Sequence, residues 1–188
     1  MKRLNLILNG KGGVGKSFFA INFVQFLKDK GIAHVAIDSD NENSTLKRFH
    51  PDARFVDLAD RRGPDGIFNT LEKSNLVVMD CRAASTDLFI DFFAQINLPS
   101  VLSALGASLT LVMPVNHESD SVDQVQRLTD EFGKKCGYVV VRNAATAKVL
   151  SCMKAPKFAP NSKTSWPAKK SPWINCRIGS SWLLTSKT

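Results

Sequence analysis

A run of glycine and lysine residues near the start of the chain has the spacing of a phosphate-binding loop. Residues 9–17 fit Gly-x-x-x-x-Gly-Lys-[Ser/Thr] and lie directly between an apolar segment and a helical pattern. Glycines let successive backbone N–H groups turn toward an anion, and the following helix adds its positive N-terminal end. In such a loop Lys16 reaches the β and γ phosphates and Ser17 ligates magnesium. The residues predicted to surround the phosphates are Gly10, Lys11, Gly12, Gly13, Val14, Gly15, Lys16 and Ser17.

The same glycines allow a second interpretation. Gly10, Gly12 and Gly15 also spell Gly-x-Gly-x-x-Gly, and Asp38 follows the next strand candidate, where a dinucleotide-binding fold places its ribose-binding acid. This alternative makes the chain an NAD(P)-dependent oxidoreductase with a Rossmann fold. It leaves the Lys16-Ser17 pair unexplained, because a lysine at this turn is not part of that fingerprint.

Three apolar segments must position these groups. Residues 4–8 precede the glycine loop, residues 33–37 run into Asp38-Ser39-Asp40, and residues 76–79 run into Asp80. Short apolar runs of this kind are typical of buried parallel strands, and open α/β sheets bind ligands at the carboxyl ends of their strands. An apolar strand ending in aspartate also resembles the second magnesium-side element of phosphate-loop enzymes.

Further strands and helices alternate along the rest of the body. This alternation predicts an α/β chain with a mainly parallel sheet between two helical layers, the three-layer phosphate-loop NTPase fold, incomplete at its C-terminal end. The expected helices cover residues 17–30, 43–49, 67–73, 85–96, 101–105 and 119–134, and the expected further strands cover residues 54–58, 108–113 and 138–141.

The charge of the chain is unevenly distributed. The net charge of +8 lies entirely in residues 144–188, because residues 1–143 carry equal numbers of basic and acidic side chains. We therefore expect a nucleotide-binding domain over residues 1–143, followed by a basic tail rich in Lys, Ser, Pro and Trp. There is no apolar run of membrane-spanning length and no secretory signal pattern, and the four cysteines lack the close pairing of a zinc site. A cytoplasmic location and free thiols follow as expectations.

Lys11 sharpens the identification. A loop reading Lys-Gly-Gly-Val-Gly-Lys-Ser, with a lysine at its second position as well as Lys16, resembles the deviant Walker A motif of the ParA/MinD family of ATPases, in the SIMIBI class. Asp38-Ser39-Asp40 looks like the switch I of that family, and Asp80 looks like its Walker B acid. Asn143 matches its adenine-contacting asparagine. The resemblance is strong over residues 1–40 and looser up to residue 143, and it is closest to plasmid-borne members serving partition, stability or transfer.

The resemblance implies a switch driven by ATP and Mg²⁺. Two subunits close face to face, each Lys11 crosses to the partner's phosphates, and hydrolysis releases them. Asp40 then positions the attacking water, and Asp38 and Asp80 hold the metal through water. The implied partners are a second copy of the chain and a protein that stimulates hydrolysis.

Two positions depart from the family pattern. Asn41 follows Asp40 where the family often has proline, and Arg82 lies in a segment after Asp80 that lacks the usual proline. These changes affect switch geometry more than nucleotide binding. A nucleotide-binding interaction module without hydrolysis therefore stays open as a third interpretation.

The tail after Asn143 has two interpretations. One is a flexible basic arm for DNA or RNA, with lysines contacting phosphates and tryptophans stacking on bases. The other is a frameshift, because a shifted frame across residues 148–182 permits an acidic, amphipathic, helix-forming translation. The frameshift is favoured since it restores agreement between local propensity and fold, and sequencing the gene decides it.

Overall fold

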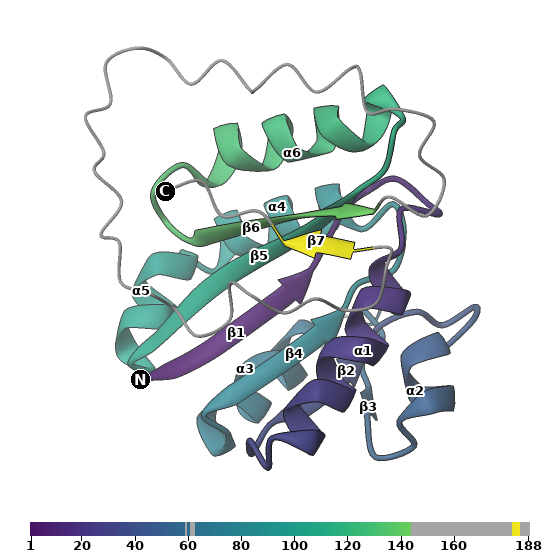
Figure 1. Ribbon diagram of the computed structural model, residues 1–188. Coiled ribbons are helices and arrows are strands. Elements are labelled where there is room, and N and C mark those ends of the chain that lie inside the picture. The colour runs from purple at the N-terminus through teal and green to yellow at the C-terminus, as the bar shows by residue number, and fades with distance from the viewer. Residues whose placement is uncertain (59, 61–62, 144–181, 185–188) are drawn as a thin grey trace.

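A computed structural model of the chain describes residues 1–58, 60, 63–143 and 182–184. Seven strands form one sheet in the order β3-β2-β4-β1-β5-β6-β7 (Figure 1). The first six are parallel to their neighbours, and β7 pairs antiparallel with β6 at the edge. The strands are β1 (Lys2–Ile7), β2 (Val35–Asp38), β3 (Arg54–Phe55), β4 (Leu76–Asp80), β5 (Ala107–Val115), β6 (Gly137–Asn143) and β7 (Trp182–Leu184).

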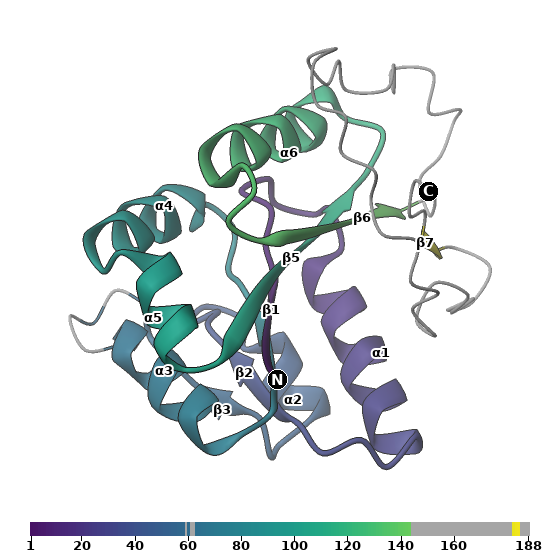
Figure 2. The same ribbon diagram turned by 90° about the vertical axis from the view of Figure 1, so that its left-hand side faces the viewer.

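Helices cover both faces of this sheet, which gives the three expected layers (Figure 2). One face packs against α1 and α2, and the other against α3, α4, α5 and α6. The helices are α1 (Lys16–Asp29), α2 (Thr45–Phe49), α3 (Gly63–Lys73), α4 (Thr86–Gln95), α5 (Leu98–Ala104) and α6 (Ser119–Phe132). The predicted α/β class with a mainly parallel sheet is confirmed.

The central strand shows why the sequence folds into these layers. Leu4, Leu6 and Leu8 are fully buried and pack toward α3 to α6, whereas Ile7 packs toward α1 and α2. Successive side chains of a strand point to opposite faces, so this mostly apolar run, broken only by the partly buried Asn5, places apolar side chains on both faces. The run ends at Asn9, and the chain leaves the sheet there to form the glycine loop.

The strand order separates the two interpretations of the glycine pattern. In this sheet β4 lies between β1 and β2, with Leu4 opposite Val77 and Ile37 opposite Met79. The Rossmann order 3-2-1-4-5-6 instead makes the first two strands neighbours. The overlapping Gly-x-Gly-x-x-Gly pattern therefore does not lie in the strand arrangement that its dinucleotide-binding interpretation requires.

The predicted boundaries need small corrections. Helix α5 begins at Leu98, so Pro99 lies in its first turn, where a missing N–H costs nothing, instead of ending the preceding helix. Strand β6 extends to Asn143, and the pairing of β7 was not anticipated. The other predictions for the tail concern residues 144–181 and 185–188, outside the described part. None of the helices described here combines the length and apolar character needed to span a membrane.

Candidate nucleotide-binding site

The glycine loop connects β1 to α1 and depends on backbone conformations that favour glycine. Gly13 has φ of 72° and Gly15 has φ of 98°, and α1 begins directly afterwards at Lys16. Gly10 is needed for a different reason, since a Cβ there would lie 2.6 Å from Oε1 of Gln124 and 2.9 Å from Oγ1 of Thr86. The loop therefore places backbone N–H groups and a helix N-terminus around one point, as an anion-binding cradle requires.

Asn9 anchors the start of this loop, a role that the sequence did not reveal. Its side chain is fully buried and its amide nitrogen donates to the carbonyl oxygens of Pro114, at 2.9 Å, and Ser121, at 3.0 Å. Its Oδ1 accepts the backbone N–H of Lys11 at 2.9 Å. One side chain therefore ties the loop to the end of β5 and the start of α6.

Lys16 lies almost buried at the start of α1, with 7% of its surface exposed. Its ammonium group donates to the carbonyl oxygen of Lys11 at 2.9 Å, across the loop. Burial lowers the pKa of Lys16, and the negative charge of Asp80 is the largest influence opposing that shift. The loop thus holds the ammonium group of Lys16 against its own backbone, at the start of α1.

Asp80, at the end of β4, is the most informative group of the site. It is 1% exposed, and neither carboxylate oxygen has a hydrogen-bond partner among the described residues. Burial raises the pKa of Asp80 to about 7, and interaction with Ser17 and the charge of Lys16 partly offset this rise. Buried carboxylates without partners are costly unless a cation balances them. The pair Asp80 and Ser17 therefore fits a bound Mg²⁺, which prefers oxygen ligands.

Asp38 and Asp40, the other predicted acids, follow β2. Asp38 is fully buried, and its two oxygens accept the backbone N–H groups of Asp40 and Lys47, each at 2.9 Å. Asp40 is half-buried and its Oδ1 accepts the N–H groups of Glu42, at 3.0 Å, and Asn43, at 3.2 Å. Both acids lie near Asp80, as the sequence predicted, and both also shape the loop between β2 and α2.

Lys11 is held within its own chain by two acids before and at the start of α6. Its ammonium lies 2.9 Å from Oε2 of Glu118 and 3.3 Å from Oδ2 of Asp120. Hydrogen bonding to Glu118, and then to Asp120, raises the pKa of Lys11, and the bond to Lys11 lowers the pKa of Glu118. Asn116 fixes Glu118 by donating to its Oε1 at 3.2 Å. These acids were missed in the sequence because nothing there placed them beside the loop.

Asn143 also reaches the loop. It is the last residue of β6, and its amide nitrogen donates to the carbonyl oxygen of Val14 at 3.1 Å. The structure therefore brings every residue predicted to take part in the site to the carboxyl edge of the sheet.

Cys81, next to Asp80, is a buried free thiol whose pKa is raised well above its usual value by burial.

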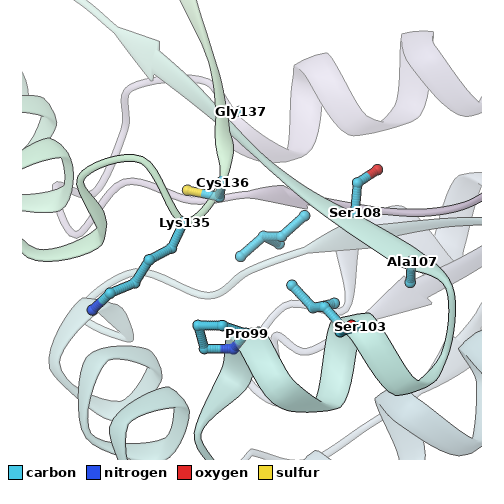
Figure 3. Close-up of a pocket in the computed structure, with 9 residues that line it drawn as sticks. Pro99, Ser103, Ala107, Ser108, Lys135, Cys136 and Gly137 are labelled. Atoms are coloured by element: carbon cyan, nitrogen blue, oxygen red, sulfur yellow. The ribbon is translucent and has the colours of Figure 1, made fainter.

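Two hollows show where the described surface is open. One, of about 350 Å³, lies beside the loop and is lined by Gly10, Lys11, Asp120, Asp123 and Gln124. The other, of about 380 Å³, lies at the amino-terminal ends of the strands, between α5 and the starts of β5 and β6 (Figure 3). Its lining includes Pro99, Ser103 and Cys136 and none of the residues predicted for chemistry, so it is separate from the candidate site.

The fold and site together define a phosphate-loop nucleotide-binding domain. Residues 6–153 match the family described as CobQ/CobB/MinD/ParA nucleotide binding domain, and the chain belongs to this family. The resemblance to ParA and MinD proteins is thereby confirmed. The match also favours the phosphate-loop interpretation of residues 9–17 over the dinucleotide-binding one.

The chain is also similar to several individual proteins. Two Escherichia coli proteins named TraL are each 29% identical to the chain over 76% of its length, and MobD of Acidithiobacillus ferrooxidans is 26% identical over 74%. The chain spans 64% of each TraL protein and 63% of MobD, less than two thirds of their length. Chloroplast FtsY from Physcomitrella patens shares the fold, with a TM-score of 0.50 and 13% identity, covering 74% of this chain and 49% of that one.

Proposed function

We propose that the chain is an ATPase that binds Mg²⁺ and ATP, dimerises on ATP and hydrolyses it. The observation that carries this proposal is the buried Asp80 carboxylate at the glycine loop, close to Ser17 and Lys16, whose oxygens have no hydrogen-bond partner in the part of the chain that the structure describes. A positive loop and an unbalanced buried acid at one place suit a phosphate chain and its metal. Membership of the CobQ/CobB/MinD/ParA family supports nucleotide binding independently of this geometry.

The proposed roles follow from position. Lys16 and the loop N–H groups bind the β and γ phosphates, while Ser17, Asp38 and Asp80 hold Mg²⁺, the aspartates through water. When bound, Mg²⁺ neutralises charge that develops on the phosphate oxygens. Asp40 orients the attacking water from the loop after β2. Asn143 contacts the adenine from the end of β6, and its hydrogen bond to Val14 O places it next to the loop.

Lys11 gives the proposed switch its dependence on assembly. Stabilising a phosphoryl-transfer transition state needs positioned positive charge, so a lysine supplied by a second copy makes hydrolysis conditional on dimerisation. The ion pairs of Lys11 with Glu118 and Asp120 must open before this lysine can cross. Each is partly exposed and hence weak, so dimerisation can break both.

The wider role is also part of the proposal. We assign the chain to plasmid or chromosome partition, or to a related plasmid-maintenance or transfer process, in the cytoplasm. A second copy of the chain and a protein that stimulates hydrolysis are the expected partners. DNA is a further partner only if the basic residues 144–188 are native sequence and not the product of a frameshift, and sequencing the gene tests this.

The test compares two lysines of the same loop. Lys16→Ala should lower ATP affinity by about 10²-fold or more, because it removes a cation aimed at the phosphates. Lys11→Ala should leave binding by the monomer nearly unchanged and reduce dimerisation. Calorimetry with ATP and Mg²⁺ measures binding, and light scattering with a non-hydrolysable analogue measures assembly. The matched control is Lys28→Ala. Lys28 is an exposed residue of α1 that forms an ion pair with Asp52.

Three outcomes would change the assignment. Tight NAD binding without ATP binding would replace it with the oxidoreductase alternative. ATP binding with background turnover, even with DNA and the partner protein present, would leave a nucleotide-binding interaction module. Equal loss of monomer binding in both lysine variants would argue against a crossing Lys11.

A further inference from the structure

Ser39 lies at the junction between the two loops that carry the predicted acids. Its hydroxyl donates to the carbonyl oxygen of Asp80 at 3.0 Å and accepts the backbone N–H of Arg82 at 3.2 Å. Its own backbone N–H also donates to Asp80 O, at 3.1 Å. The residue is 1% exposed, so these bonds are protected from water. One serine therefore joins the end of β2 to the first residues after β4.

A second link joins the same loops further from the sheet. The guanidinium of Arg82 donates to Oδ1 of Asn41 at 3.4 Å, on the exposed rim. Asn41 directly follows Asp40, the acid proposed to orient water. This contact therefore links the loop after β4 directly to the residue that follows Asp40.

The loop after β4 is in turn tied to the glycine loop. The backbone N–H of Ala84 donates to the carbonyl oxygen of Gly10 at 3.0 Å, and Ala84 has φ of 56°, a left-handed conformation that costs an alanine energy. A strained residue persists where its surroundings hold it, and here Gly10 accepts its N–H. Hydrogen bonds thus tie the loop after β4 to the glycine loop at Ala84, and to the loop after β2 at Arg82, two residues earlier.

We infer that Ser39 and the Asn41–Arg82 pair are positioning residues that set Asp40 relative to Asp80 and the glycine loop. A displacement of the loop after β4 is passed to Asp40 through the buried hydroxyl of Ser39 and the exposed guanidinium of Arg82. The catalytic consequence rests on the function proposed above, whereas the mechanical link between the loops does not. A direct contact of Arg82 with phosphate is the rival role for that residue.

The kinetic test separates positioning from binding. Ser39→Ala should lower kcat by about 10- to 100-fold with KM nearly unchanged, because small misplacements of a catalytic group cost factors of this order. Arg82→Ala and Asn41→Ala should each lower kcat less, and the double variant should be no worse than either single one. Arg82→Lys should restore part of the loss. The controls are Ser108→Ala, whose hydroxyl contacts Lys2 O at the far edge, and Arg127→Ala on α6.

Hydrogen exchange tests the same link without any nucleotide. The amides of Glu42 and Asn43 donate to Asp40 Oδ1, so they report whether that carboxylate stays in place. Ser39→Ala and Arg82→Ala should speed their exchange, while both controls leave it at the wild-type rate. If the wild type does not bind ATP, the proposed function fails and the exchange data still judge the link.

Two results would overturn the inference. The first is wild-type exchange and wild-type kcat in Ser39→Ala, in a protein that does hydrolyse ATP. The second is a raised KM in Arg82→Ala that Asn41→Ala does not reproduce, which would assign Arg82 to the phosphates. Arg82 and Asn41 lie at the exposed rim, so their variants keep the test valid if Ser39→Ala fails to fold.

Discussion

Two aspartates lie side by side at the ends of β2 and β4, and their carboxylates have different hydrogen-bond partners. Asp38 and Asp80 are partners in the parallel register, and at most 1% of either is exposed. Both oxygens of Asp38 accept backbone N–H groups, from Asp40 and Lys47. Both oxygens of Asp80 are without hydrogen-bond partners among the described residues.

The following loop decides which role each acid takes. After Asp38 the chain turns back over the carboxylate and runs into α2, so its own N–H groups fill the acceptor sites. After Asp80 the chain leaves toward the glycine loop, where Ala84 N donates to Gly10 O, and the carboxylate remains near Lys16 and Ser17. The same residue type in the same register therefore has both carboxylate oxygens bonded to backbone N–H groups on one strand, and both open to a cation on the next.

Matched asparagine substitutions provide the strongest test of this difference. Asp80→Asn should lower Mg²⁺-dependent ATP turnover by about 100-fold, a typical upper cost for groups that support a metal site. Its stability at pH 8 should not fall, because the change removes a buried charge whose cost of burial outweighs its interactions with Ser17 and Lys16. Phosphate release measures the first effect and urea denaturation the second. A stable Asp80→Asn protein with wild-type Mg²⁺ dependence would remove Asp80 from the metal site.

Asp38→Asn should show the opposite profile. An amide keeps one acceptor oxygen and loses the other, so one partly buried N–H···O bond, from Asp40 or Lys47, is lost. That loss should cost about 1–3 kcal/mol of unfolding free energy, with a smaller effect on turnover than Asp80→Asn. Urea denaturation measures it, with Asp52→Asn on the surface as the control. If Mg²⁺ dependence falls as far as in Asp80→Asn while stability holds, Asp38 contributes to the metal site as much as Asp80 does, and its bonds to backbone N–H groups do not set it apart.

The sequence predicted the elements of this site better than their contacts. The glycine loop was predictable because its backbone needs positive φ at Gly13 and Gly15, which favours glycine at those positions. The strands were predictable because burial of both faces requires apolar runs. Asp38 and Asp80 were indistinguishable in the sequence, since each simply ends an apolar strand. Their difference arises from backbone N–H groups that only the folded loops bring into place.

Long-range partners explain the remaining gaps. Asn9 looks like a variable position of the loop motif, yet it contacts carbonyl oxygens of residues more than 100 positions away in the sequence. Glu118 is also more than 100 positions from Lys11 in the sequence, so no local sequence pattern predicted their ion pair. The incomplete C-terminal end and the basic tail remain predictions, because they concern residues 144–181 and 185–188.

The pH dependence of stability gives the finest test of the comparison. The pKa of Asp80 rises from an ordinary 3.8 to about 7 in the folded protein. Between these values the folded chain binds a proton that the unfolded chain has released, so stability declines as pH rises toward 7 and levels off above it. The slope is at most about 1.4 kcal/mol per pH unit for one proton. Urea denaturation from pH 5 to 8 should show this decline in the wild type.

Two comparisons isolate the carboxylate. Asp80→Asn should lose this part of the slope, whereas Asp38→Asn should keep it, although its stability is lower at every pH. Mg²⁺ favours the ionised carboxylate, so the apparent affinity for Mg²⁺ with nucleotide should instead rise with pH, by at most about tenfold per unit, and level off above 7. Proton and metal then compete for one buried group. If the slope of unfolding free energy against pH is unchanged in Asp80→Asn, the proton is bound elsewhere and the carboxylate of Asp80 is not the titrating group.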